Sequence, residues 1–327
     1  MANIAISVVV PCYNEQEVLM QTHARLTQVL SSMRVPYEII YIDDGSRDET
    51  LSILKGLHRE DAHVVVISFA RNFGQQAASS AGLDASRGQA VVLIDADLQD
   101  PPELIPQMVE LWQQGVEVVY GKRKKRAGEN VFKKMTSALY YRLFRWLSDS
   151  NAPLDTGDFR LMDRKVVDTL NAMGEHNRYL RGMVNWVGFT QQAIEFDRKE
   201  RAAGETKYGL KQMLRLASDG IFSFSIKPLT LATRIGGLVT VGAIAAWIVQ
   251  LVMRLSGYVF RFSDVALVGL FFLLGILFMC MGLMGSYLGR ISEESKNRPI
   301  YIVSEFYRRK QAPPQPAAQD EEGEQLP

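Results

Sequence analysis

Two aspartates that lie one residue apart form the strongest chemical signal in the sequence. Asp95 and Asp97 follow the apolar run Ala90–Ile94, and Gln99 comes two residues later. Because side chains alternate along an extended segment, the two carboxylates point the same way and would repel each other. A divalent cation that prefers oxygen ligands, Mg²⁺ or Mn²⁺, relieves this repulsion, with phosphate oxygens in its remaining positions. The spacing therefore predicts a site for a metal ion and a phosphorylated ligand.

Other polar side chains follow two further apolar runs. Asp44 comes after Tyr37–Asp43, and its carboxylate is suited to accept hydrogen bonds from a nucleobase or a ribose. Tyr13 and Glu15 follow the first apolar run, where Tyr13 could stack on a base while Glu15 accepts its hydrogen bonds. The alternative is that Asn14, in the same turn, only caps the next helix. These residues indicate a nucleotide as the phosphorylated ligand.

Several classes of protein are disfavoured by what the sequence lacks. It contains no GxGxxG, GxxxxGK[ST] or GxSxG segment, which argues against dinucleotide dehydrogenases, P-loop enzymes and serine hydrolases. The 37 basic and 36 acidic side chains give a net charge of +1, which argues against binding nucleic acid through overall charge. Cys12 and Cys280 stand apart and the four histidines lack ligand spacing, so neither a disulfide framework nor a zinc site is predicted.

Short β-branched runs alternate with longer segments of helical periodicity over the first 120 residues. The expected strands are Ile4–Pro11, Tyr37–Asp43, His63–Phe69, Ala90–Ile94 and Val116–Tyr120. The expected helices are Glu15–Ser32, Asp48–His58, Gln75–Ser86 and Pro102–Gln114. Continuously apolar strands that start about every 26 to 33 residues are typical of βαβ units with helices on both sheet faces. We therefore predict an α/β fold with a doubly wound, mostly parallel sheet, whose strands carry the site at their carboxyl ends.

The C-terminal third contains two long segments without formal charge, Ile235–Met253 and Val265–Leu288. At about 1.5 Å of rise per residue, each is long enough to cross a hydrocarbon core of about 30 Å. A buried core helix is the alternative, and it is stronger for the first segment, which contains three glycines. The pattern predicts a transmembrane hairpin.

Basic residues indicate how this hairpin is oriented. Those outside it are Arg215, Lys227, Arg234, Arg290, Lys296, Arg298 and Arg308, whereas the connecting loop has only Arg254 and Arg261. By the positive-inside rule, we expect both ends of the hairpin in the cytoplasm. Residues 210–234 and Val131–Leu147 show amphipathic spacing, and the second of these mixes aromatic with cationic side chains. We interpret both as helices in the membrane interface, with packing against another domain as the alternative.

Six motifs together resemble those of one enzyme family. They are VVVPCYNE, YIDDGSRDET, ARNFGQQAA, DADLQDPPE, GDFRLMDR and GETKYG, and the resemblance covers about residues 4–305. The sequence is similar to the polyprenyl-phosphate glycosyltransferases, which include dolichol-phosphate mannose synthase and the bacterial bactoprenol glucosyltransferases. This resemblance implies a nucleotide-sugar-binding fold called GT-A, and the two terminal spans resemble the bactoprenol branch.

The resemblance also implies roles for particular residues. The nucleotide sugar would be bound by Pro11, Tyr13, Glu15, Ile42, Asp44, Asp95, Ala96, Arg201 and Lys207. The metal ligands would be Asp95, Asp97 and Gln99. The residues assigned to catalysis would be Asp97, Asp158 and Arg123. Within these sets, Arg201 and Lys207 flank the GET segment and would hold the diphosphate.

On the acceptor side the match is looser. Lys133 and Ser137 fall where related enzymes place an arginine and a serine, four residues apart and therefore on one helix face. Lysine keeps the charge of arginine but loses its bidentate fork, and Lys134 could substitute. Asp158 would position the acceptor or take a proton from it. The alternative for Asp158 is an ordinary turn aspartate that bonds to its own backbone.

These expectations combine into a membrane-anchored, inverting glycosyltransferase. It would transfer glucose from UDP-glucose to undecaprenyl phosphate on the cytoplasmic face of the bacterial inner membrane, with Mg²⁺ or Mn²⁺. Mannose, galactose, N-acetylhexosamine and an aminoarabinose derivative remain open as the sugar. A polysaccharide synthase is a second interpretation, but its usual QxxRW motif and additional spans are absent from the sequence. A non-catalytic membrane protein that binds nucleotide sugar is a third.

The expected organisation has four parts. Residues 1–209 form the catalytic domain, 210–234 a juxtamembrane segment, 235–288 the two transmembrane helices and 289–327 a cytoplasmic tail. The expected partners are nucleotide sugar, polyprenyl phosphate and membrane lipids, without nucleic acid, and the resemblance also suggests a homo-oligomer.

Overall fold

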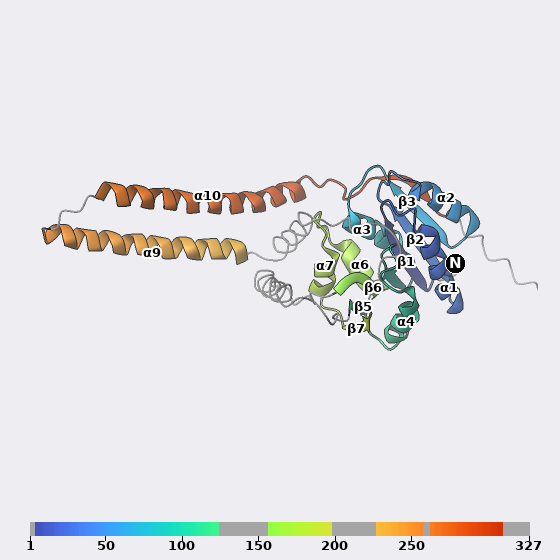
Figure 1. The fold of residues 1–327 in the computed structure, drawn as a ribbon. Helices are drawn as coiled ribbons and strands as arrows, with labels where there is room; N and C mark the ends of the chain where they lie inside the picture. Colours follow the sequence, from blue (N-terminus) through green and yellow to red (C-terminus); the bar gives the residue numbers. More distant parts are fainter. Residues whose placement is uncertain (1–3, 124–155, 198–226, 258–261, 310–327) are drawn as a thin grey trace, which may run out of the picture.

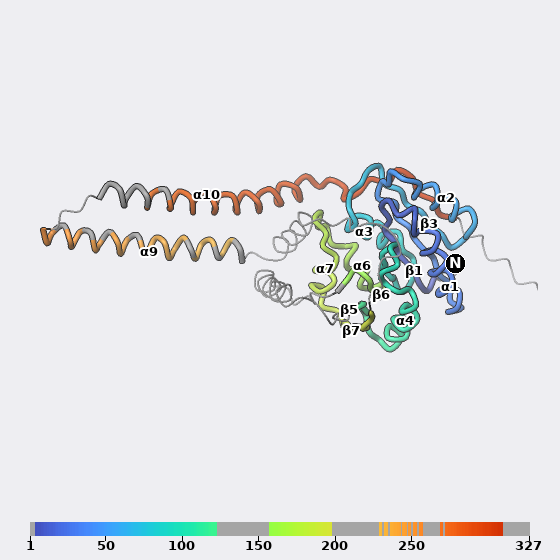
Figure 2. Tube along the Cα trace, viewed as in Figure 1, coloured from blue at the N-terminus to red at the C-terminus, as the bar shows by residue number. Residues whose placement is uncertain are grey.

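The computed structural model describes residues 4–123, 156–197, 227–257 and 262–309. A sheet covered by helices forms the larger body, and two long helices extend away from it (Figures 1 and 2). Four of the predicted site residues, Lys133, Ser137, Arg201 and Lys207, lie outside the described residues, as do Val131–Leu147 and residues 210–226 of the expected interfacial segments.

The sheet has eight strands among the described residues. They are β1 (Ile6–Cys12), β2 (Tyr37–Asp43), β3 (Val64–Phe69), β4 (Ala90–Leu93), β5 (Val118–Arg123), β6 (Thr156–Asp163), β7 (Gln191–Phe196) and β8 (Val303–Tyr307). Their order is β7-β5-β6-β4-β1-β2-β3-β8, and β1 to β4 pair in parallel. β6 runs antiparallel to both β4 and β5, and β8 runs antiparallel to β3. The α/β class is thus confirmed. The sequence did not indicate β6, β7 and β8; of these, β6 and β8 run antiparallel to their neighbours and make the sheet mixed, whereas β7 pairs in parallel with β5.

Helices cover both faces of the sheet. They are α1 (Leu19–Ser32), α2 (Thr50–Glu60), α3 (Gln75–Ala85), the 3₁₀ turn η1 (Pro102–Leu104), α4 (Ile105–Gln113), α6 (Arg164–Ala172) and α7 (Leu180–Trp186). Alternate side chains of each central strand enter two hydrophobic cores, one with α1, α2 and α4 and the other with α3, α6 and α7. Burial on both faces explains why the central strands read as continuous apolar runs.

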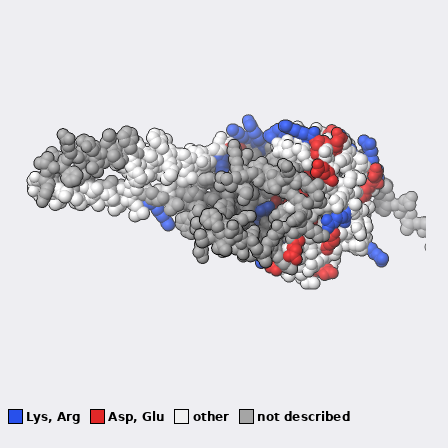
Figure 3. Space-filling model, viewed as in Figure 1, with Lys and Arg blue, Asp and Glu red and all other residues white. Residues whose placement is uncertain are grey.

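Two long helices, α9 (Lys227–Leu255) and α10 (Phe262–Ser295), lie side by side (Figure 1). Ala232–Met253 and Phe272–Ser295 are each long and apolar enough to cross a membrane, and none of either segment is buried inside the protein. Burial would be required of a core helix, so that alternative is not supported. In Figure 3 the described surface of these helices is almost free of charge, whereas charged side chains of both signs cover the domain.

The chain after α10 returns to the sheet. α10 continues to Ser295, and β8 then adds an edge strand to β3. The expected division of the chain into four parts stays a prediction. Two polar contacts join the segment after α10 to the helices α2 and α3. The Lys55 ammonium lies 2.6 Å from Glu305, and the Tyr301 hydroxyl donates to Asp84 at 2.7 Å. The C-terminal end of α10 is therefore joined to the sheet through β8.

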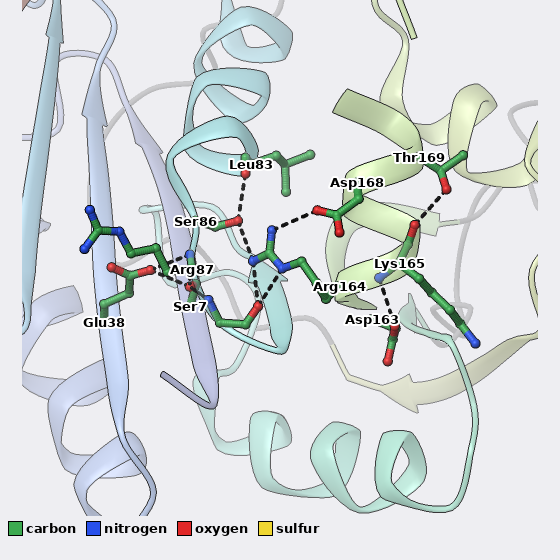
Figure 4. A network of polar contacts seen from close by, with 11 residues as sticks. Ser7, Glu38, Leu83, Ser86, Arg87, Asp163, Arg164, Lys165, Asp168 and Thr169 are labelled. Atoms are coloured by element: carbon green, nitrogen blue, oxygen red, sulfur yellow. Dashed lines mark hydrogen bonds and ion pairs between the residues drawn. The ribbon is translucent and has the colours of Figure 1, made fainter. Parts of the chain in front are cut away.

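A buried polar network connects residues at the amino ends of the central strands (Figure 4). Glu38 is only 4% exposed, and one of its carboxylate oxygens accepts from the Ser7 hydroxyl at 2.6 Å and from the backbone N–H of Arg87 at 2.8 Å. The Arg164 guanidinium of α6 donates to the Gly88 carbonyl at 2.8 Å. These contacts join β1, β2 and α6 at the edge opposite the acidic motifs.

Replacing Arg308 by Ala should lower the free energy of unfolding by about 1–3 kcal/mol. The Arg308 guanidinium lies 3.4 Å from the second oxygen of Glu38 and donates to the Ala85 carbonyl at 2.6 Å, so its loss leaves a buried carboxylate without its counter-charge. Urea unfolding of the full chain in detergent measures the change, with the exposed Lys296→Ala as control. Equal losses of unfolding free energy in Arg308→Ala and Lys296→Ala would contradict the stabilising role of Arg308.

Candidate active site

The acidic motifs meet at one edge of the sheet. In the parallel register Cys12 pairs with Asp43, so the segments that follow β1 and β2 leave the sheet together. The backbone of Ile94 continues the pairing of β4 with β1 by donating to the Val9 carbonyl at 3.1 Å. The Thr22 hydroxyl of α1 donates to the Ala96 carbonyl at 2.7 Å. The carboxyl ends of β1, β2 and β4 thus form a single candidate site, as the sequence predicts.

Specific contacts orient the Asp95–Asp97 pair. The Gln75 side-chain amide donates to Asp95 Oδ1 at 2.8 Å. The backbone N–H of Gln99 donates to Asp97 Oδ1 at 3.1 Å, across a left-handed turn at Leu98 with φ of 59°. Asp95 and Asp97 are partly exposed, whereas Ala96 and Gln99 are buried. Both predicted acidic ligands therefore face the edge of the sheet with defined orientations.

Negative charge is concentrated around Asp95. Burial, together with the neighbouring carboxylates of Asp158, Asp100 and Asp97, raises the pKa of its carboxyl to about 8, against the opposing effect of Arg181. A divalent cation would offset this repulsion. The described residues contain no group of three or more His, Cys, Asp or Glu side chains placed to hold a metal ion. Two carboxylates still fit a nucleotide-bound Mg²⁺ or Mn²⁺, because such ions take much of their coordination from phosphates and water.

Asp158 reaches the site from β6. Leu93 pairs with Arg160 in the antiparallel register, and Asp158, two residues before Arg160, lies close enough to Asp95 for its charge to raise the pKa of the Asp95 carboxyl. Asp158 is 4% exposed, and its two carboxylate oxygens accept from the Arg181 guanidinium of α7 at 2.7 and 3.0 Å. It lies in a strand and pairs with another element, so it is not an ordinary turn aspartate.

Two arginines of this site, Arg160 and Arg181, are not among the residues predicted from the sequence. Arg160 is buried beside Asp158, where desolvation lowers the pKa of its guanidinium to about 10, and it donates to the Gly157 carbonyl at 3.1 Å. It belongs to the GDFRLMDR motif, which could have drawn attention to it. No sequence pattern around Arg181 indicates a role in the site, because only the packing of α7 brings this residue to Asp158.

Asp44 is engaged by the protein itself. It is 3% exposed, and its carboxylate oxygens accept from the backbone N–H groups of Phe73 at 2.7 Å and Gly74 at 2.9 Å. Burial raises the pKa of its carboxyl, and these two N–H groups oppose the rise. Asp44 thus orders the loop that enters α3, and its contact with a nucleoside stays a prediction.

The turn after β1 is fixed by contacts with the Asp44 side of the site. The side chain of Asn14 accepts from the backbone N–H of Arg47 at 2.9 Å, and α1 begins only at Leu19, so Asn14 does not cap that helix. The backbone N–H of Glu15 donates to the Thr50 hydroxyl at 2.8 Å. The side chains of the neighbouring predicted residues, Pro11, Tyr13 and Glu15, are half-buried.

For two other predicted residues, Ile42 and Arg123, the described part of the structure shows no side chain facing the site. Ile42 is fully buried in the core on the α3 side of the sheet, so only its backbone is available to a ligand. Arg123 is the last residue of β5, and its side chain lies outside the described part of the structure. The structure therefore brings Asp95, Asp97 and Asp158 together, while the basic half of the predicted site is not described.

Comparison with known proteins identifies the family of this chain. The model of the family described as glycosyl transferase family 2 matches residues 7–170. The chain is 47% identical over 307 residues to the uncharacterized glycosyltransferase YkcC of Bacillus subtilis (strain 168), covering 93% of this chain and 95% of that protein. The chain belongs to glycosyl transferase family 2.

Further relatives carry more specific names. The chain is 39% identical over 300 residues to the prophage bactoprenol glucosyl transferase homolog of Escherichia coli (strain K12), covering 91% of this chain and 98% of that protein. This confirms the resemblance to the bactoprenol branch that the motifs indicate. Among solved structures, glucosyl-3-phosphoglycerate synthase from Mycobacterium tuberculosis matches with a TM-score of 0.47 and 18% identity, covering 68% of this chain and 77% of that one.

Proposed function

We propose that this glycosyltransferase moves glucose from UDP-glucose to undecaprenyl phosphate, with inversion at the anomeric carbon, on the cytoplasmic face of the membrane. The observation that carries the proposal is a cluster of carboxylates at the carboxyl edge of the sheet, in the same chain as an exposed apolar helix pair. Relatives named bactoprenol glucosyl transferases, at 38–39% identity over more than nine-tenths of this chain, support both the lipid acceptor and the sugar.

Asp95 and Asp97, with Gln99 close by, would hold Mg²⁺ or Mn²⁺ against the donor diphosphate. The ion supplies charge stabilisation to the departing nucleoside diphosphate. The protein holds the two carboxylates at a fixed edge of the sheet, so little reorganisation is needed when the donor binds. We further propose that Arg201, Lys207 and Arg123 add positive charge around the same diphosphate.

Asp158 would act on the acceptor side as a positioning group. Its carboxylate accepts two hydrogen bonds from the Arg181 guanidinium, which hold it in a fixed orientation. A strong base is not required, because the second pKa of a phosphomonoester is about 6 and the attacking oxygen is already ionised near neutral pH. The lipid phosphate itself would be held by Lys133 and Ser137.

The membrane anchor follows from the exposed surface of α9 and α10. Large apolar side chains such as Leu238, Phe272 and Phe278 are 64–75% exposed, which is unfavourable in water and favourable in a lipid bilayer. The C-terminal end of α9 and the N-terminal end of α10 lie away from the sheet (Figure 1), as expected for a hairpin inserted from the cytoplasm. The site then faces the leaflet that contains the polyprenyl phosphate.

Binding of Mn²⁺ to the full chain should tighten as the pH rises from 6 to 8 and should release a proton. Because the pKa of Asp95 is raised to about 8, its carboxyl carries a proton below that pH, and the metal must displace the proton. The apparent affinity should therefore fall about tenfold per pH unit below 8. Calorimetry at pH 7 in buffers of different ionisation enthalpy measures the released proton, and a pH-independent affinity would contradict the prediction.

The proposed function is tested with purified full-length protein in detergent. Undecaprenyl phosphate, Mn²⁺ and radiolabelled UDP-glucose should give a lipid-linked sugar, whereas undecaprenol, which lacks the phosphate, should give none. Parallel reactions with UDP-N-acetylglucosamine and GDP-mannose identify the sugar. A lipid product from another donor only would overturn the glucose assignment, and no product with any donor would overturn the reaction itself.

A further inference from the structure

Two adjacent glutamines in the first turn of α3 contact opposite halves of the candidate site. Gln75 donates to Asp95 Oδ1 at 2.8 Å, on the metal side. Gln76 accepts, through Oε1, the backbone N–H of Leu180 at 3.0 Å, on the α7 side. Both side chains are half-buried. One helix end therefore touches both the acidic pair and the helix that carries Arg181.

The first turn of α3 is held in place on several sides. Ala77, Ala78 and Ala81 are buried in the core beneath it. The loop before the helix is fixed by Asp44, which accepts the N–H groups of its last two residues. Gly74 precedes the helix with φ of 100°, a conformation that suits glycine. A fixed backbone at this point makes the two glutamine side chains rigid supports.

The chemical roles of the two side chains differ. Gln75 must donate, because its partner is a carboxylate oxygen, and by fixing Oδ1 it orients Oδ2 of Asp95. Gln76 must accept, because its partner is a backbone N–H at the start of α7, where no intrahelical acceptor exists. The residue after Leu180 is Arg181, which binds Asp158.

We propose that Gln75 and Gln76 are positioning residues that support the two halves of the site independently. Gln75 orients Asp95 toward the metal-bound diphosphate. Gln76 fixes the first turn of α7 and thereby the Arg181–Asp158 pair that faces the acceptor. This inference rests on the proposed function for the identity of donor and acceptor, but the contacts can be tested without turnover.

The first test uses Mn²⁺ alone as the probe. Mn²⁺ binding to the full chain in detergent, measured by electron paramagnetic resonance, should weaken about tenfold or more in Gln75→Leu, since supporting residues of a metal ligand typically matter by this factor. Gln76→Leu should bind Mn²⁺ within about twofold of the unchanged protein, as should the exposed control Gln28→Leu. Unchanged binding in Gln75→Leu, equal losses in both variants, or no binding to the parent protein would overturn the role of Gln75.

The second test uses amide hydrogen exchange of α7. Gln76→Leu should exchange faster over Leu180–Trp186, whereas Gln76→Glu keeps an acceptor oxygen and should exchange like the parent protein. In the sugar-transfer assay Gln76→Leu should raise the KM for undecaprenyl phosphate, with recovery in Gln76→Glu. Unchanged exchange in Gln76→Leu, or no recovery in Gln76→Glu, would overturn the role of Gln76. A parent protein without turnover that still shows both binding and exchange effects would overturn the proposed function and leave these contacts supported.

Discussion

Replacing Asp97 by Asn should lower sugar transfer about a hundred- to a thousandfold while changing the free energy of unfolding little. The substitution removes one of the two acidic ligands that we propose for the metal, and a neutral amide is a much weaker partner for a divalent cation. Loss of a single preorganised electrostatic contact to a charged transition state has an effect of this size. The contact of Asp97 with the backbone N–H of Gln99 can be made by the amide oxygen of Asn, so the loop should keep its conformation.

Initial rates with saturating UDP-glucose and undecaprenyl phosphate measure this effect. Asp168→Asn is the matched control, because that carboxylate is 62% exposed on α6 and lies outside the site. Its rate should stay within about twofold of the parent rate. Full activity of Asp97→Asn would remove the central element of the proposed site, whatever the identity of the sugar.

Replacing Arg181 by Met should destabilise the protein by about 3 kcal/mol and also lower its transfer rate. Arg181 is the bidentate partner of Asp158, whose side chain is only 5% exposed, so its loss removes two charge-assisted hydrogen bonds from a buried carboxylate. The remaining acidic cluster would then also lose the positive charge that lowers the pKa of Asp95. The pH midpoint for Mn²⁺ binding should therefore move upward in this variant.

A double-mutant cycle separates the charge effect from simple loss of packing. Asp158→Asn removes the buried negative charge that Arg181 pairs with, so adding it to Arg181→Met should restore part of the lost unfolding free energy in urea titrations. Additive losses in the double variant would mean that the two side chains act independently, which the 2.7 and 3.0 Å contacts do not predict. The transfer rate should stay low in the double variant even where stability returns.

Membrane attachment and the half of the site on β1, β2 and β4 were predictable because local patterns decide them. Continuously apolar strands separated by helical segments predict parallel pairing, and the carboxyl ends of parallel strands share one edge. This places Asp44 and Asp95 together without any knowledge of register. Long uncharged segments likewise identify α9 and α10 by length alone. The expected bounds of Tyr37–Asp43 agree with β2, and those of the other early strands differ by a few residues.

The other half of the site depends on contacts that no local pattern records. β6 carries Asp158 and Arg160 within its eight residues, so its apolar run is interrupted and it was read only as a motif. Its antiparallel pairing with β4 brings Asp158 close to Asp95. β8 is short and pairs with a strand more than two hundred residues away, so it was assigned to a tail.

The sequence by itself determined the family, the α/β class, the metal-type acidic pair and the apolar helix pair, because each depends on residue type and short-range spacing. Tertiary structure alone decided which side chains surround that acidic pair. Arg181, Gln75 and Gln76 become site residues only when α3 and α7 pack on the same sheet face. Such packing is set by the burial of many apolar side chains at once, and the polar contacts at its edge are a consequence that no single motif encodes.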